Sequence, residues 1–518
     1  NCQQSSGLRL DNLPNDTDND SIPNSEDSDD NNDGYPDADN DSDGLIEISS
    51  LEQLNAMRYN LSGSGRVLSE GGISDNSGCP LVFIEGRLQQ HCSGYELTTD
   101  LDFDTNDDGV MDNLDIYWNS GEGWEPIGSA ITPFTGIFNG NGHTINNLFI
   151  NRESEEFVGL FGTADQYTAH ISSVILAGNL MNITGGWYTG SLVGLISNSA
   201  TVSDNFVTGT VTANSYAGGL IGIATNSIID NNYTSVTVTS QEGAGGLVGG
   251  AILSKLTNNV AIGSVDSEKF VGGLMGSSET STLENNYAMG PVYGNEYAGG
   301  LIGELVGSTI TNSYWITDTT GQDTSAEQSE ESGYFGISLS DLQCPTNGTD
   351  SNCTAYPSLF ENWDDAVWDF ITPNQLPGLT INGVIYRDTD FDGVLDHEDD
   401  DDDNYCFPEL NAKIEEAIRQ LGGAVMPKLN WSAPKDGTWI NEGSMKCQTP
   451  GDVYILLKSS DFCSHDLLYA FSNCEKQDQA DSVPYHLILR KWCNLHASME
   501  FRCFVTQRKL GKYQCLPY

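Results

Sequence analysis

A short pattern of hydrophobic and polar positions recurs over residues 158–315. One repeated phrase is Gly-Leu-x-Gly or a close variant, and its leucines are Leu160, Leu192, Leu220, Leu247, Leu274 and Leu301. From Leu220 onward the interval is 27 residues. A second phrase keeps this interval, at Asn205, Asn232, Asn259, Asn286 and Ser313. Two phrases that share one period indicate a single structural unit that recurs.

The pattern inside each unit is typical of short strands. Apolar residues alternate with polar ones in Ala217-Gly-Gly-Leu-Ile-Gly222 and Asn232-Tyr-Thr-Ser-Val-Thr-Val238, and Gly, Asn and Ser between them favour turns. A unit this short cannot bury its apolar face alone, so neighbouring units must stack, about 4.8 Å apart. We expect a right-handed parallel β-solenoid over residues 134–316, with the leucines in one inward column and the asparagines in an amide ladder. A Gly-rich sandwich and a disordered Gly/Ser tract are the alternatives.

These phrases resemble a known repeat family. Val271-Gly-Gly-Leu-Met-Gly276 and its equivalents are similar to the GLUG repeats of bacterial surface adhesins, and the segment Phe134 to Leu148 resembles the entry rung that precedes such repeats. The resemblance covers most of residues 46–387. It implies a solenoid at the cell surface or outside the cell, with a surface ligand or matrix glycan as partner.

Segments on either side of the repeats predict caps. Residues 46–133 should form an N-terminal cap and lead-in strands, beginning with a helix whose capping-box signature is Ser50-Leu-Glu-Gln53 and which ends near Gly63. Residues 317–387 should form a C-terminal cap. There Trp363, Trp368 and Phe370 are expected to close the end of the core, although exposed aromatic rings of this kind can also stack on sugars.

Charge and cysteine usage both change near residue 404. The chain carries a net charge of −53, which divides into −54 over residues 1–404 and +1 over residues 405–518. Such an acidic surface disfavours nucleic acid as a partner and favours divalent cations or a saline environment. Cys79/Cys92 and Cys344/Cys353 are close pairs that predict disulfides of an exported protein, whereas the seven later cysteines resemble reduced cytosolic ones. No apolar run is long enough to span a membrane.

Acidic loops recur at four places, in residues 1–45, near residue 108 and in residues 388–404. In each, oxygen-bearing side chains alternate with other residues and a Gly permits a sharp turn, which is what Ca²⁺ needs to gather six to eight oxygens. The loops resemble short bacterial thrombospondin type 3 repeats. A solvated acidic linker is the alternative. The predicted calcium ligands are Asp16, Asp18, Asp20, Asp29, Asn31, Asp33, Asp37, Asp39, Asp41, Asp43, Asp104, Asn106, Asp108, Asp112, Asp388, Asp390, Asp392 and Asp396.

The chain after Tyr405 has a different pattern, which predicts a small α/β domain over residues 405–518. Leu410, Ile414, Ile418 and Leu421 form one helical face that ends at Gly422-Gly423. The phrase Ala424 to Asp436, which contains Pro-Lys-Leu-Asn-Trp-Ser-Ala-Pro, then closely resembles the cell division cycle protein 123 family, as do Leu487 to Trp492 and Met499 to Phe504. The match covers about residues 404–510.

This second resemblance implies a partial ATP-grasp-like fold, ATP and magnesium as cofactors, a cytoplasmic location, and the gamma subunit of translation initiation factor 2 as partner. By position, Lys428 would contact phosphate and the loop from Trp431 to Asp436 would cover the nucleotide. The implied cofactor-binding residues are Lys428, Trp431, Ala433, Lys435, Asp436, Arg490, Trp492, Cys493 and Arg502. The segment lacks the acidic and Asn cluster that would hold magnesium, so a half-domain that does not bind nucleotide is the alternative.

Three classes of function compete for this composite chain. The first is adhesion by a calcium-stabilised solenoid joined to a truncated assembly-chaperone segment. In the second, the C-terminal segment defines the function, as assembly of initiation factor 2, and the solenoid is a fusion artefact. The third is a β-helix enzyme that cleaves polysaccharides, which would need paired carboxylates or a calcium-assisted base on one face. The repeats contain only Lys255 and Lys269 as cations and show no catalytic constellation.

Overall fold

The structure is a computed structural model of the chain, and it divides into two compact units, residues 1–389 with 393–400 and residues 390–392 with 401–518. It describes residues 37–84, 86–325, 334–343, 359–360, 363–370, 376–389, 395–397, 413–414, 417–429, 432–440, 444–460, 462–463, 486–492, 501–506 and 509–515. None of the helices in this described part combines the length and hydrophobicity that a membrane crossing needs.

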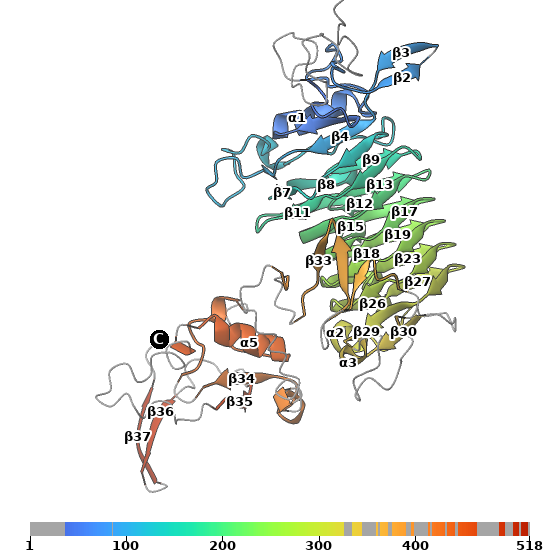
Figure 1. Ribbon diagram of the computed structural model, residues 1–518. Helices are drawn as coiled ribbons and strands as arrows, with labels where there is room; N and C mark the ends of the chain where they lie inside the picture. The colour runs from blue at the N-terminus through green and yellow to red at the C-terminus, as the bar shows by residue number, and fades with distance from the viewer. Residues whose placement is uncertain are drawn as a thin grey trace, which may run out of the picture. The chain divides into compact units, whose positions relative to one another are not determined.

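The first unit is a parallel β-solenoid with three sheets, as the repeat predicts (Figure 1). Sheet A consists of β1 (Leu45–Ile48), β4 (Gly94–Leu97), β6 (Ile137–Asn139), β10 (His170–Ser172), β14 (Thr201–Ser203), β17 (Ile228–Asp230), β20 (Lys255–Thr257), β24 (Thr282–Glu284) and β28 (Thr309–Thr311). Sheet C consists of β9 (Phe161–Asp165), β13 (Val193–Ser197), β16 (Ile221–Thr225), β19 (Val248–Ile252), β23 (Met275–Glu279) and β27 (Ile302–Val306).

Sheet B contains the longest strands. It consists of β5 (Leu101–Asp102), β7 (Thr144–Asn146), β8 (Phe149–Val158), β11 (Ile175–Ala177), β12 (Asn182–Gly190), β15 (Phe206–Gly218), β18 (Tyr233–Gly245), β21 (Val260–Ala261), β22 (Val265–Gly272), β25 (Tyr287–Ala288), β26 (Val292–Gly299), β29 (Ser313–Ile316) and β30 (Tyr334–Ile337). All pairings within the three sheets are parallel. From β15 to β29 the register advances by 27 residues per rung, as in Phe206↔Tyr233 and Tyr233↔Val260, whereas the earlier rungs are longer, as in Leu45↔Gly94 and Ile175↔Phe206. The 27-residue period is therefore one turn of the solenoid.

The leucine column and the asparagine ladder are both confirmed. Leu192, Leu220, Leu247, Leu274 and Leu301 are all fully buried, and the backbone N–H of each of the first four donates to the carbonyl oxygen of the leucine in the next rung. The amide of Asn232 donates to Asn259 Oδ1 at 3.0 Å, and that of Asn259 donates to Asn286 Oδ1 at 2.9 Å. Because these amides are buried, the ladder satisfies polar groups that would otherwise be costly in the core.

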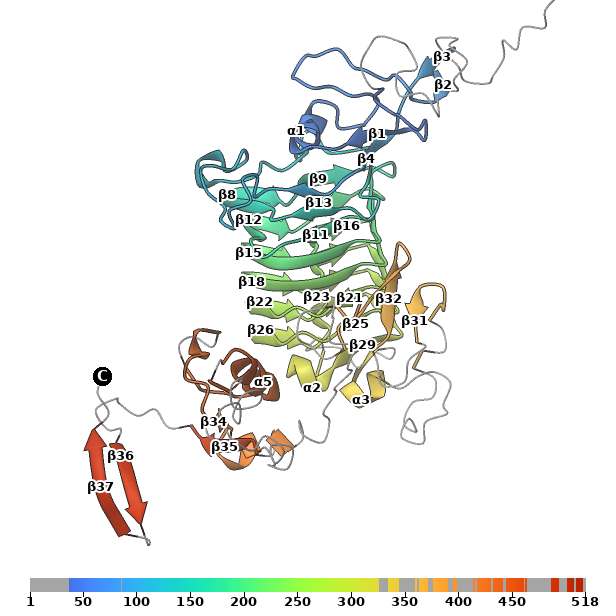
Figure 2. The ribbon, with the colours of Figure 1, turned by 60° about the vertical axis from the view of Figure 1, so that its left-hand side comes forward.

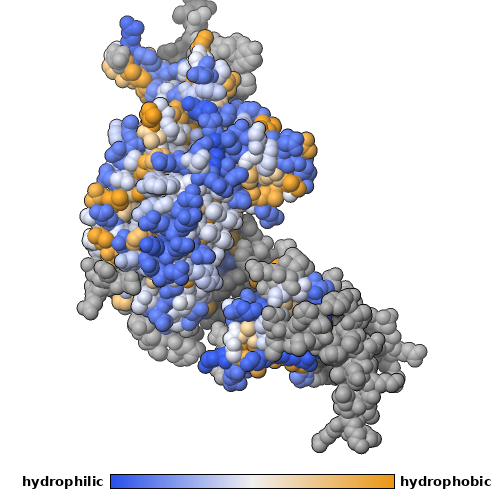
Figure 3. Space-filling model, turned by 180° about the vertical axis from the view of Figure 1, so that it is seen from behind, coloured by the Kyte–Doolittle hydropathy of each residue, from blue (hydrophilic) through white to orange (hydrophobic). Residues whose placement is uncertain are grey.

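Glycines before the leucines let neighbouring rungs approach closely. A Cβ built on Gly246 would lie 2.2 Å from the carbonyl oxygen of Gly273 in the next rung, and one built on Gly245 would lie 2.6 Å from the Cα atom of Met275 in that rung. No side chain fits at such distances, so the repeated Gly-Gly pair is required by backbone packing. The face of the solenoid seen in Figure 3 is mainly hydrophilic, with scattered hydrophobic patches.

The N-terminal cap contains a shorter helix than the sequence predicts. Helix α1 (Leu51–Ala56) is followed by the 3-10 turn η2 (Met57–Tyr59), so it ends before Gly63. The side chain of Asn60 donates to Gly65 O at 2.8 Å and stabilises a turn that competes with further helix. A two-stranded hairpin, β2 (Leu81–Ile84) and β3 (Arg87–Gln90), projects from this cap, and the expected disulfide Cys79–Cys92 closes its base. Cys344 and Cys353 lie outside the described residues.

Residues 363–370 and 376–389, which we call the lateral strap, lie along the side of the solenoid instead of across its end (Figure 2). The strap contains β31 (Trp368–Asp369), β32 (Gly378–Ile381) and β33 (Val384–Tyr386). Trp368 Nε1 donates to Asn258 Oδ1 at 3.2 Å, and further along the strap Asn382 Oδ1 accepts from Ser173 Oγ at 3.0 Å. Trp363 and Trp368 are therefore core residues, as expected, but they cover sheet B. At the C-terminal end β30 continues sheet B, next to α2 (Thr317–Thr320) and α3 (Leu339–Leu342).

The second unit has the expected mixture of helix and strand. Strand β34 (Val425–Lys428) pairs antiparallel with β35 (Ile488–Lys491), and β36 (Phe501–Thr506) pairs with β37 (Lys509–Cys515). The remaining elements are η4 (Thr438–Ile440) and α5 (Pro450–Lys458). Ile414 and Ile418 are buried, and Gly423 N donates to Ile418 O at 2.8 Å, so the helical residues 417–420 are followed by a stop at the predicted glycines.

Candidate functional site

The acidic loop from Asp39 to Gly44 is folded by its own carboxylates. Asp39 is fully buried, and its two oxygens accept from Asp43 N at 3.2 Å and from Gly44 N at 2.8 Å. Asp41 and Asp43 each accept from the backbone amide two residues later. Gly44 adopts a φ of +99°, which a residue with a side chain rarely adopts. The alternating sequence therefore directs three carboxylates towards one point.

Two further carboxylates join this loop from sheet A. Glu47 on β1 and Glu96 on β4 lie directly opposite each other in the parallel register. Like charges opposite one another on neighbouring strands destabilise a sheet. The sequence analysis did not predict these two residues as ligands. The similar phrases Ile46-Glu47-Ile48 and Tyr95-Glu96-Leu97 could have identified them as equivalent positions on stacked rungs.

The five carboxylates have the spacing of a cation site. Oxygens of Asp39, Asp41 and Asp43 lie within 4.8 Å of one another, as do those of Asp41, Glu47 and Glu96. Calcium binds oxygens at about 2.3–2.6 Å, so two of its ligands are at most about 5 Å apart. In the described part of the chain the buried Oε2 of Glu47 has no hydrogen-bond partner. The donor set thus fits one hard cation, or two that share Asp41.

The pKa values of this cluster reflect crowded, buried acids. Burial raises the pKa of Asp39 to about 7, and the charges of Asp43 and Asp41 add to the effect. Burial likewise raises the pKa of Glu47 to about 7, with smaller contributions from Asp39 and Glu96. The pKa values of Asp43 and Glu96 are raised for the same reason. Without a cation, the ionised cluster is therefore unfavourable in the folded protein.

The loop from Asp104 to Gly109 has the same backbone geometry but different surroundings. Asp104 accepts from Asp108 N at 3.2 Å and from Gly109 N at 2.8 Å, as Asp39 does in its own loop. A buried residue absent from the prediction, Asp115, then accepts from Thr105 N and from Asp112 N, both at 2.8 Å. The carboxylates of Asp104, Asp108 and Asp112 do not form a group like that at Asp41 among the described residues. Asp115 follows Asp104 by eleven residues, the spacing of the last ligand in a 12-residue calcium loop, and this spacing could have identified it.

The other predicted metal ligands are placed only in part. Asp37 is buried beside the Asp39 loop, and its carbonyl accepts from Arg66 Nη1 at 3.2 Å. Asp388 is buried, and Asp396 accepts from Thr389 N and Oγ1, both at 2.7 Å. The remaining predicted ligands lie outside the described residues, namely Asp16, Asp18, Asp20, Asp29, Asn31, Asp33, Asp390 and Asp392.

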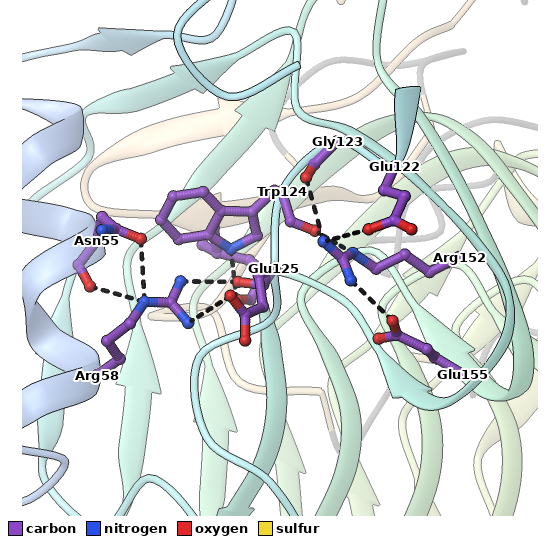
Figure 4. A network of polar contacts seen from close by, with 9 residues as sticks. Asn55, Arg58, Glu122, Gly123, Trp124, Glu125, Arg152 and Glu155 are labelled. Atoms are coloured by element: carbon purple, nitrogen blue, oxygen red, sulfur yellow. Dashed lines mark hydrogen bonds and ion pairs between the residues drawn. The ribbon is translucent and has the colours of Figure 1, made fainter. Parts of the chain in front are cut away.

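Two arginines, the partly buried Arg58 and the buried Arg152, attach the segment after the Asp104 loop to the solenoid (Figure 4). Arg58 donates to Glu125 O at 3.0 Å and lies 5.4 Å from the centre of the Trp124 ring. Arg152 donates to Trp124 O at 2.9 Å and forms an ion pair with Glu155 at 2.7 Å. Burial lowers the pKa of Arg58. These contacts hold the segment around Trp124 against the solenoid.

In the second unit, the structure places Lys428 and Arg490 on neighbouring strands. Met426 lies opposite Arg490 and Lys428 lies opposite Ile488, so Lys428 and Arg490 share one face of the two-stranded sheet. Lys428 Nζ donates to Leu429 O at 2.9 Å, and Trp492 N donates to Ala424 O at 3.0 Å. The structure thus brings the two predicted phosphate-binding cations to the same face.

Other predicted cofactor-binding residues have structural contacts or are not placed. The carboxylate of Asp436 accepts from Ser460 Oγ at 2.5 Å and from Phe462 N at 3.1 Å. Lys435 is exposed, and Ala433 accepts from its amide at 2.8 Å. Trp431 and Cys493 lie outside the described residues, and of Arg502 only the backbone, in β36, is described.

Magnesium does not fit the acids described in this unit. Among its described residues only Asp436 and Asp452 are acidic. Asp452 accepts from Gln448 N at 2.6 Å and from Thr449 N at 3.0 Å, which caps helix α5. Both carboxylates therefore accept hydrogen bonds from the protein's own donors. Asp436 lies in a loop and Asp452 lies in the first turn of α5, so the two acids are not neighbours in the sequence.

Comparisons with known proteins separate the two units. Residues 385–511 match the family model D123. Over 123 residues the chain is 52% identical to cell division cycle protein 123 of Phaeosphaeria nodorum, which covers 22% of this chain and 32% of that protein. Over 125 residues it is 52% identical to the translation initiation factor eIF2 assembly protein of Schizosaccharomyces pombe, covering 23% and 39%. The chain thus spans about a third of the length of the curated relatives it matches.

Two solved structures extend these comparisons. A structure of C-terminally truncated Cdc123 from Schizosaccharomyces pombe is 50% identical, covers 22% of this chain and 48% of its own, and has a TM-score of 0.19. A candidate immunoglobulin A1 protease from Bacteroides ovatus is 17% identical, covers 64% of this chain and 91% of its own, and has a TM-score of 0.40.

Proposed function

We propose that the solenoid unit is a calcium-stabilised binding scaffold of the adhesin type. The observation that carries the proposal is the group of five carboxylates around Asp41, at the N-terminal end of the stack. Bound calcium would neutralise the repulsion between Glu47 and Glu96 and join the Asp39 loop to two strands of sheet A. The disulfide Cys79–Cys92 supports an oxidising environment outside the cytosol for this unit.

Calorimetric unfolding of the full chain tests this proposal. A ligand that binds only the folded state at 100 times its Kd adds about 2.7 kcal/mol to the free energy of unfolding. We expect the melting transition of the solenoid to rise in calcium relative to a chelator, and magnesium to have a smaller effect because it accepts crowded carboxylates less readily. A transition at the same temperature in calcium and in chelator would refute the proposal.

For the second unit, we propose a role in eIF2 assembly, as part of a larger Cdc123-like domain. The sequence identity of 52% to an eIF2 assembly protein supports it, and the shared face of Lys428 and Arg490 is a basic surface for an acidic partner or a phosphate. The gamma subunit of eIF2 is the partner we propose. Tight ATP binding is not part of the proposal, because Asp436 and Asp452 are occupied by backbone and hydroxyl donors.

Binding of the full chain to purified eIF2 gamma subunit tests this second role. We expect Lys428→Glu together with Arg490→Glu to weaken binding by about tenfold or more, since truncation of charged contacts costs about 2–5 kcal/mol. Lys446→Glu is the matched control, because Lys446 is an exposed lysine of the same unit whose Nζ donates to Gln448 Oε1. No binding by the unchanged chain, or equal loss in the control, would contradict the role. Micromolar, saturable ATP binding that Lys428→Ala abolishes would show that the nucleotide site is intact.

A further inference from the structure

A groove lies between sheet B and the strap, where β33 passes β15 and β18 in Figure 1. Its volume is about 590 Å³, within the range of about 300–1,000 Å³ for small-ligand sites. Ile175, Met181 and Phe206 form its apolar side on the solenoid, and Tyr386 and Leu395 form the facing side. The rings of Phe206 and Tyr386 pack 4.7 Å apart, so the strap and the solenoid share one wall.

Hydroxyl and amide groups line the open part of this groove. Thr144 and Asn146 come from β7, Thr208 and Thr210 from β15, and Ser235 from β18. Thr208 and Ser235 are partners in the parallel register, so successive rungs present hydroxyls one above the other. All five side chains are partly exposed. Together the five side chains form a patch of neutral donors and acceptors.

No charged side chain lines the groove among the described residues that form it. The contrast with the rest of the molecule is large, because the whole chain contains 74 acidic residues. A cation or a polar anion would gain no ion pair here. An apolar wall beside closely spaced hydroxyls and amides instead matches a ligand with one apolar face and many hydroxyl groups.

We propose that this groove binds a neutral saccharide. The inference rests on the proposed scaffold function and names the ligand class of that scaffold. The C–H face of a sugar ring would pack on the wall formed by Phe206, Tyr386 and Leu395, and its hydroxyls would bond to Thr208, Thr210 and Ser235. Sugars with carboxylate or sulfate groups would be disfavoured, because the chain carries a net charge of −53 and the described residues of the groove include no cation.

Calorimetric titration of the full chain in calcium tests the proposal. The probes are neutral hexasaccharides of glucose, mannose and xylose, with hyaluronan and heparin fragments of similar length for comparison. We expect saturable binding of at least one neutral probe and weaker or no binding of the anionic probes. Absence of binding by every neutral probe, or tighter binding of an anionic one, would overturn the proposal.

Three variants locate the binding site. Ser235→Trp should fill the groove and abolish binding, and Thr208→Val, which keeps the side-chain shape but removes one hydroxyl, should weaken it by about fivefold. Thr282→Val on sheet A is the matched control, since Thr282 is exposed and lies outside the groove, and should leave binding unchanged. If Thr208→Val and Ser235→Trp both bind the saccharide as tightly as the unchanged chain does, the sugar binds elsewhere and the assignment is overturned.

The melting transition in calcium and in chelator separates this inference from the function on which it rests. Calcium-dependent melting without saccharide binding would contradict the groove assignment alone. Saccharide binding without calcium-dependent melting would contradict the calcium proposal alone.

Discussion

The loops at Asp39 and Asp104 have the same backbone hydrogen bonds but different environments. In both, the first Asp accepts from two amides at 3.2 and 2.8 Å. Only the Asp39 loop receives additional carboxylates, from Glu47 and Glu96 on sheet A. In the other loop Asp115 accepts from amides within the same segment. The comparison shows that alternating acids specify a loop shape, while the neighbouring strands decide how many further carboxylates gather around that loop.

Removing the first Asp of each loop should have the largest effect. In calcium, Asp39→Ala should lower the free energy of unfolding by about 5 kcal/mol, because it removes both charge-assisted hydrogen bonds and the contribution of the metal. Asp104→Ala should cost about 3 kcal/mol in calcium and in chelator alike. In chelator Asp39→Ala should cost less than Asp104→Ala, since it also relieves repulsion. Denaturant unfolding of both variants in calcium and in chelator measures these losses of unfolding free energy. If each variant loses the same amount in both buffers, the two loops do not differ in their dependence on a cation.

Glu96→Gln should produce the next largest effect, with opposite signs in the two buffers. In calcium the variant should lose about 2.7 kcal/mol of metal-dependent stability, and in chelator it should be more stable than the unchanged chain, because one of two facing charges is gone. Glu284→Gln is the control, since Glu284 lies further along sheet A between Thr257 and Thr311 and faces no acid there. Thermal unfolding measures both variants. Destabilisation in chelator would show that Glu96 has a structural role instead.

The stability of the protein and its affinity for calcium should both depend on pH through the carboxylates around Asp41. The folded-state pKa values of Asp39 and Glu47 are raised to about 7, so in chelator the protein should lose stability as pH rises from about 4 to about 7. Calcium requires ionised carboxylates, so its affinity should be about tenfold or more weaker at pH 5.5 than at pH 7.5. Titration calorimetry at the two pH values measures this change. A pH-independent affinity would contradict the assignment of these residues as ligands.

Asp115→Asn should have the smallest effect. The amide oxygen can still accept one of the two backbone hydrogen bonds, so the expected loss is about 1 kcal/mol, the same in calcium and in chelator. Thermal unfolding in both buffers checks this. A loss confined to calcium would show that the Asp104 loop also binds the ion, which would weaken the contrast with the Asp39 loop.

The sequence predicts the repeated parts of the fold well because each repeated residue has the same neighbours in every rung. The period places Leu247 above Leu274 and Asn232 above Asn259 without knowledge of any other segment. The lateral strap has no such constraint. Trp368 contacts Asn258, more than one hundred residues away in sequence, and nothing in the local pattern around Trp368 specifies the side of the solenoid instead of its end.

The candidate site, like the fold, was predictable from the sequence where its contacts are local and not where they depend on strand pairing. Asp39, Asp41 and Asp43 follow from local spacing, because their carboxylates bind amides within the loop. Glu47 and Glu96 are 49 positions apart and meet only because β1 and β4 pair in register. In the second unit, family resemblance identified Lys428 and Arg490, and strand pairing places them on one face.

An anomalous difference map from a crystal of the full chain grown with calcium tests the central claim most directly. We predict at least one calcium peak at about 2.3–2.6 Å from a carboxylate oxygen of Asp41, with further ligands from Asp39 and Asp43 or from Glu47 and Glu96. No peak at this cluster, or a peak at the Asp104 loop alone, would contradict the claim.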